Sequence, residues 1–111
     1  MNRDKMKYSE CIMHQTMAAA LGTKWKPIVI WKIRDRKARF GQIAAAIGVI
    51  SRKVLTDTLK ELEEDGLILR EEREGLPLRV EYSLTKKGAA LLPILKQLHE
   101  WGVHFRGEEN L

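Results

Sequence analysis

Four side chains close together in the sequence could bind the edges of DNA bases and the phosphates between them: Arg52, Lys53, Thr56 and Lys60. Arginine and lysine donate hydrogen bonds to O6 and N7 of guanine, and threonine can contact the methyl group of thymine. At 100° per residue, Lys53 and Lys60 point away from the apolar side of a predicted helix, with Arg52 and Thr56 on one flank. The alternative is that all four form the solvated face of an ordinary helix.

The helix that carries them, predicted over residues 51–65, has its charges placed against its own dipole. Ser51 is a good N-cap, and its hydroxyl is also a candidate phosphate ligand. Arg52 and Lys53 stand at the positive end, and the negative end is acidic: Glu61, Glu63, Glu64 and Asp65. Each such placement costs about 0.3–1 kcal/mol when exposed. Local rules that fail together are typical of a functional site, and a helix whose first turn meets phosphate would have this pattern.

The elements around this helix predict a winged helix-turn-helix. A short helix over residues 41–47 and the turn Gly48-Val49-Ile50 precede it, and strands over residues 67–73 and 79–84 follow it. Residues 38–40 are predicted to add a short third strand to the sheet of the hairpin. Helix, tight turn, helix and β-hairpin form an α+β fold, mostly α, that places one helix in the major groove and a loop beside it.

The hairpin is the predicted wing. In its second strand Val80, Tyr82 and Leu84 alternate with polar residues, which predicts one buried and one solvated face. Arg73 and Arg79 flank the turn between the strands, from which they could contact the phosphate backbone or the minor groove. The alternative is that both arginines are solvated surface residues that contact no DNA.

Helices are also predicted over residues 11–21, 24–35 and 94–105, and Pro93 is expected to break or kink the helix that Thr85 caps. We expect inward side chains on the second of these helices: Trp25, Ile28, Val29 and Ile33. The first and last helices carry apolar stripes, that of the last being Leu95, Leu98, Trp101 and Phe105. These stripes are more apolar than a small monomer needs to expose, which predicts a homodimer that reads an inverted repeat. Residues 1–10 are expected to be a flexible tail, residues 11–106 the winged helix-turn-helix domain with terminal dimerisation helices, and residues 107–111 a C-terminal tail.

Length, charge and cysteine content limit the class of protein. The 111 residues suffice for one domain, and the net charge is +5. Residues 1–60 hold 13 Lys and Arg against 4 Asp and Glu, whereas residues 61–111 hold 7 against 11. The basic excess therefore lies in the half that ends with the first turns of the helix over residues 51–65, a pattern typical of a nucleic-acid footprint. The single cysteine, the polar start and the short apolar runs predict a cytoplasmic protein that does not enter the membrane.

The sequence resembles the HxlR family of winged-helix transcriptional regulators. The resemblance covers residues 11–102 and rests on GTKW from Gly22, Arg39-Phe40, LKELEEDGL from Leu59, PLRVEYSLT from Pro77, Gly88 and Leu92-Pro93. It implies a homodimer built on the terminal helices and two recognition helices on a palindromic operator. It also implies that Cys11 is a candidate sensor of oxidants or electrophiles, although Ile12 follows it where the family usually has proline. Thr23 stands where a second glycine is common.

Alternatives exist both for the role of Cys11 and for the function of the whole chain. Cys11 could be an inert, partly buried thiol. Cys11 and His14 are three residues apart, but two ligands are a weak signal, so we expect no metal and no cofactor. The sequence contains no Ser-His-acid set, carboxylate pair or glycine-rich phosphate loop, which argues against an enzyme. The alternative function is a winged-helix protein–protein interaction module that binds no nucleic acid.

Overall fold

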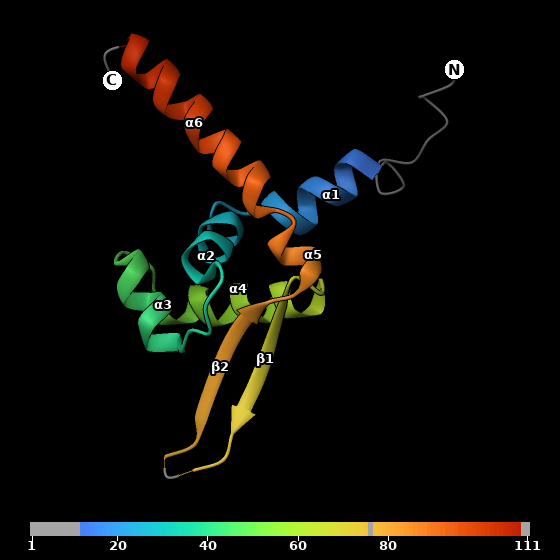
Figure 1. Ribbon diagram of the computed structural model, residues 1–111, viewed down its shortest axis with the longest axis vertical. Coiled ribbons are helices and arrows are strands. Elements are labelled where there is room, and N and C mark those ends of the chain that lie inside the picture. The colour runs from blue at the N-terminus through green and yellow to red at the C-terminus, as the bar shows by residue number, and fades with distance from the viewer. Residues whose placement is uncertain (1–11, 76, 110–111) are drawn as a thin grey trace.

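The computed structural model describes residues 12–75 and 77–109 of the chain (Figure 1). These residues form a mostly helical fold with one two-stranded antiparallel sheet, which confirms the predicted fold class. In chain order the elements are α1 (Ile12–Leu21), α2 (Trp25–Ile33), α3 (Phe40–Ile47), α4 (Arg52–Glu64), β1 (Ile68–Arg73), β2 (Arg79–Leu84), α5 (Lys86–Ala89) and α6 (Leu92–Glu109). The predicted tail at residues 1–10 lies outside the described residues.

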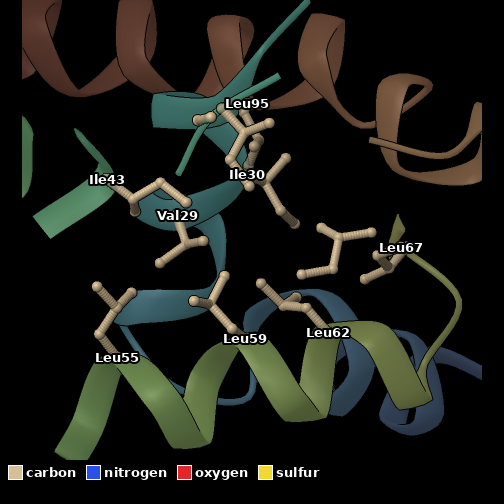
Figure 2. Packing of buried hydrophobic residues seen from close by; sticks show 11 residues of the cluster. Val29, Ile30, Ile43, Leu55, Leu59, Leu62, Leu67 and Leu95 are labelled. Carbon is tan, nitrogen blue, oxygen red and sulfur yellow. The ribbon is translucent and has the colours of Figure 1, made fainter. Parts of the chain in front are cut away.

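The core forms where α2 crosses α4 (Figure 2). Leu55, Leu59 and Leu62 on α4 are at most 2% exposed, as their spacing predicted. They pack with apolar residues of the neighbouring elements: Val29, Ile30, Ile33, Ala38, Ile43, Leu67, Ile68 and Leu95. One side of α4 is therefore fixed by burial, which leaves its opposite side free for another role.

The inward face of α2 was predicted only in part. Val29 and Ile33 are fully buried, whereas Trp25 and Ile28 are half-buried. Ile30, which the sequence did not assign to the core, is also fully buried. A helix enclosed by α1, α3, α4 and α6 buries more than one stripe, so a single-face pattern underestimates its core.

A tight turn joins α3 to α4. Gly48 ends α3 with φ of +88°, a conformation that favours glycine, and its N–H donates to the Ala44 carbonyl at 2.9 Å. Residues 49–51 then lead into α4. The short α3 and the longer α4 thus form the predicted helix-turn-helix (Figure 1).

The hairpin pairs Ile68 with Leu84 at its base and Arg73 with Arg79 near its tip. The predicted third strand is reduced to one antiparallel bridge between Ala38 and Tyr82, because α3 already begins at Phe40. The expected alternation of buried and solvated residues along β2 is wrong, since all residues from Val80 to Leu84 are half-buried. A two-stranded ribbon that projects from the body leaves both faces partly open (Figure 1).

The start and the end of α6 both differ from the prediction. The break between α5 and α6 lies at residues 90–91, before Pro93 and not at it. Pro93 is the second residue of α6, a position at which the missing N–H of proline costs no helical hydrogen bond. The helix was predicted to end near Phe105, with residues 107–111 as a tail, but α6 continues through Gly107 to Glu109. It extends from the body on the side opposite the hairpin (Figure 1). Within the described residues, no helix is long and apolar enough to cross a membrane.

Candidate nucleic-acid interface

The start of α4 is fixed by its cap. Ser51 has an extended backbone, with φ of −74° and ψ of 154°, and its Oγ accepts a hydrogen bond from the Val54 N–H at 3.1 Å. This is the predicted N-cap, and it satisfies one of the free donors of the first turn. The remaining free N–H groups and the helix dipole make this end attractive to an anion such as phosphate.

Arg52 is held over an aromatic ring of the neighbouring helix. Its guanidinium carbon lies 4.7 Å from the centre of the Phe40 ring, a cation–π distance. Phe40 is half-buried and packs against the core, so it provides a fixed platform. The sequence had not assigned Phe40 to this site. The signal that could have identified it was an aromatic residue at the start of the helix that precedes the turn.

The other candidate side chains of α4 lie exposed along the same helix. Lys53 Nζ lies 2.9 Å from Asp57 Oδ2, and this hydrogen bond and the carboxylate charge raise the pKa of Lys53 above its ordinary value. Thr56 donates its hydroxyl to the Arg52 carbonyl at 2.8 Å, which leaves its methyl group available for apolar contact. Lys60 is exposed one turn further along. The structure therefore places all four predicted α4 residues on its solvent-facing side.

The turn adds an apolar side chain to this surface. Val49 follows the end of α3 and belongs to an apolar run of the sequence, so its type would ordinarily place it in the core. In the structure it is 85% exposed. It immediately precedes Ile50 and the capping residue Ser51. An exposed valine next to basic residues could contact a thymine methyl or a sugar. Its position in the turn after Gly48, rather than its type, is the feature that distinguishes it from core residues.

The two wing arginines have different surroundings. Arg73 Nε donates to Glu81 Oε1 at 2.7 Å, so its charge is already paired within the hairpin. Arg79 faces Arg73 in the strand register and is exposed, and among the described residues no ion pair or hydrogen bond engages its side chain. Arg70 pairs with Glu72 at 2.9 Å, and the hydrogen bonds that Glu72 and Tyr82 make with its guanidinium raise its pKa. Arg79 is thus the wing cation best able to meet a phosphate.

The basic residues fall into two groups on two elements. Those of α4 lie on its first three turns, and those of the wing lie near the far end of the hairpin, which projects from the body past α4 (Figure 1). Cys11 lies outside the described residues. Within the residues that the structure describes, no three His, Cys, Asp or Glu side chains gather as a metal site would require.

Known proteins similar to this chain are regulators of transcription. Residues 20–110 match the HxlR-like helix-turn-helix family. An HTH-type transcriptional regulator of Halalkalibacterium halodurans is 49% identical over 84 residues, which are 75% of this chain and 74% of that protein.

Solved structures agree with this match. A protein of Porphyromonas gingivalis W83, described as a MarR-family regulator, has a TM-score of 0.81 at 37% identity and covers 89% of this chain and 96% of its own. The redox regulator HypR in its oxidized form has a TM-score of 0.79 at 39% identity, over 85% of this chain and 96% of its own. Both similarities extend across most of the helix-turn-helix and the wing.

Proposed function

Because the chain belongs to the HxlR-like helix-turn-helix family of transcriptional regulators, we propose that it binds a palindromic sequence of double-stranded DNA as a homodimer. The observation that carries this proposal is the start of α4. A serine cap fixes its direction, its inner side is buried, and its outer side presents Arg52 and Lys53 to solvent. An exposed, basic, rigid first turn suits insertion into the major groove.

The roles of the individual residues follow from their positions. Lys53 and Lys60 on the outer side of α4 read bases or neighbouring phosphates, and Arg52 and Thr56 contact the flank of the same site. Ser51 caps the helix next to a phosphate. In the wing Arg79 contacts the DNA backbone, whereas Arg73, paired with Glu81, orients the hairpin and contributes less.

The dimer is supported by apolar side chains that one chain leaves exposed. On α1, Ile12 is 79% exposed and Met13 67%. On α6, Trp101 is 62% exposed, and its ring lies tilted against that of Phe105 at 5.3 Å between ring centres. Leu95, which the sequence placed in the same stripe, belongs to the core of its own chain. Exposed apolar stripes on two projecting helices are typical of a protein–protein interface, and a second copy of the chain would cover both.

A two-fold dimer places its two copies of α4 at equivalent positions. It should therefore bind half-sites one helical turn of DNA apart, or a multiple of that distance, in inverted orientation. The alternative winged-helix function, protein binding without DNA, predicts neither an inverted repeat nor a steep salt dependence.

Selection of binding sites from a random duplex library with the full-length chain tests the proposal. We expect enrichment of an inverted repeat, and light scattering at micromolar concentration should give the mass of a dimer. Failure to enrich any sequence, together with weak and salt-independent binding to random duplex, would favour the protein-interaction module. A monomer by light scattering would contradict the dimer.

The similarity to the redox regulator HypR favours a second, regulatory element of the proposal. Cys11 directly precedes α1, so oxidation or alkylation of its thiol would act beside the proposed dimer interface. We propose that such a change alters the spacing of the two copies of α4. With one cysteine per chain, a disulfide must join two subunits or a subunit and a small thiol.

A further inference from the structure

The ammonium group of Lys26 is buried where α1, α2 and α4 meet. Lys26 belongs to the first turn of α2, and the residue is only 7% exposed. Burial of a lysine charge is unfavourable unless partners surround it, so such a residue usually has a specific structural or functional role. No local pattern indicated this role, because the inward positions predicted for α2 were all apolar.

Lys26 joins α1 to the end of α4, two helices that 30 residues (22–51) separate in the chain. Its Nζ donates to the Ala18 carbonyl of α1 at 3.0 Å and to Asp65 Oδ2, at the end of α4, at 3.3 Å. Glu61 Oε2 lies 3.5 Å away. Both helices end beside this ammonium, and their dipoles place partial negative charge there. The acidic C-terminal end of α4, which opposes its own dipole, thus has a cation to stabilise it.

Few buried apolar side chains attach α1 to the rest of the fold. Within the described part of α1, Ala20 is the one buried residue. A cavity of about 390 Å³ opens beside Lys26 and Asp65, lined on the α1 side by His14, Gln15, Ala18 and Ala19. A second cavity of about 310 Å³ is lined by residues of α1 together with Leu67 and Leu91. Because few apolar contacts hold α1, its direction depends strongly on the polar contacts of Lys26.

We propose that Lys26 is a positioning residue that fixes the direction of α1 relative to α4. This inference rests on the proposed function, in which α1 contributes to the dimer and α4 enters the groove. In such a dimer, the angle between α1 and α4 within each chain sets the distance between the two copies of α4. Lys26 therefore determines which half-site spacing the protein accepts, although it does not touch DNA.

Replacement by methionine tests this role without a large effect on folding. Methionine keeps the apolar stem of Lys26 and removes the charge, and the side chains of Asp65 and Glu61 are 32% and 52% exposed, so water can solvate them. Lys86→Met, at an exposed position of α5 outside the proposed dimer helices, is the control because it changes the net charge equally. Circular dichroism should show that both variants remain folded.

The measurement is the affinity for four duplexes: the selected inverted repeat, the same repeat with one base pair added or removed between its half-sites, and a single half-site. Wild type and Lys86→Met should prefer the selected spacing. In Lys26→Met this preference should fall at least about fivefold, the lower range of typical coupling between sites. The affinity of Lys26→Met for the single half-site should match that of Lys86→Met.

Several outcomes would overturn the proposal. A wild-type spacing preference in Lys26→Met, or an equal loss of affinity for the half-site, would show that Lys26 has only a general structural role. If Lys26→Met does not fold, Asp65→Ala decides, because it removes the carboxylate that accepts a hydrogen bond from Lys26 Nζ. A reduced spacing preference supports the inference, and an unchanged one refutes it. Wild type that binds the repeat without spacing preference refutes this inference alone, whereas wild type that binds no duplex refutes the proposed function as well.

Discussion

The guanidinium of Arg52 lies over the ring of Phe40 at 4.7 Å, and this contact joins the two helices of the helix-turn-helix on their solvent side. Arg52 is the first residue of α4 and Phe40 the first residue of α3. A basic side chain that would otherwise sample many rotamers is thereby held at the start of the proposed DNA-contacting helix. Its position is defined before DNA binds, which lowers the entropy cost of binding.

Replacement of Phe40 by leucine should weaken DNA binding through Arg52. Leucine keeps an apolar side chain against the core but removes the π face, so we expect a loss of about 0.5–1 kcal/mol in binding to the selected duplex. The measurement is fluorescence anisotropy in a double-mutant cycle with Arg52→Ala. If Phe40→Leu weakens binding equally with and without Arg52, the ring does not act through this arginine.

Replacement of Lys53 by alanine should reduce specificity. Lys53 is exposed on the outer side of α4, so its loss should weaken binding to the selected duplex by about 1–3 kcal/mol if it contacts a base. Binding to random duplex should change less. Because the hydrogen bond and the charge of Asp57 raise the pKa of Lys53, this lysine stays charged near neutral pH and the contact should not titrate there. Equal losses on both duplexes would instead make Lys53 a phosphate contact.

Replacement of Arg79 by alanine should weaken binding to selected and random duplexes alike. Loss of a phosphate contact in each subunit should lower the slope of log K against log salt by about one unit per contact. Arg73→Ala is the matched variant, because Arg73 is already paired with Glu81 and should change the slope less. A slope that depends more on Arg73 than on Arg79 would reverse the roles proposed for the wing.

Replacement of Ser51 by alanine should destabilise the fold, because the Val54 N–H loses its hydrogen-bond partner. We expect the free energy of unfolding to fall by about 1 kcal/mol, and by only a few tenths for Ser51→Gly. Urea denaturation followed by circular dichroism measures both. Identical stability of Ser51→Ala and wild type would show that the cap contributes nothing.

Oxidation should change DNA binding through Cys11. Diamide should alter the affinity of wild type for the selected duplex and leave Cys11→Ser unaffected, because the serine hydroxyl does not form a disulfide. Non-reducing electrophoresis and mass spectrometry identify whether the product joins two subunits or carries a small thiol. Unchanged binding by wild type, with Cys11 still reduced, would refute the sensing role.

Local patterns in the sequence were sufficient to predict the helix-turn-helix and the wing. The apolar spacing of Leu55, Leu59 and Leu62 predicted the buried side of α4, and Ser51 and Gly66 predicted where it begins and ends. The strands agree with the predicted ranges, except that β1 begins one residue later. These features depend on residues a few positions apart, where helix periodicity, capping and turn preferences act directly.

Only the tertiary structure revealed the contacts between distant elements. The platform that Phe40 forms for Arg52 and the burial of Lys26 between the ends of α1 and α4 depend on how helices cross, which no local pattern records. The unassigned core residue Ile30 and the partly open faces of β2 have the same origin. A side chain's surroundings are set by every element that packs on it, whereas periodicity reports only the element to which it belongs.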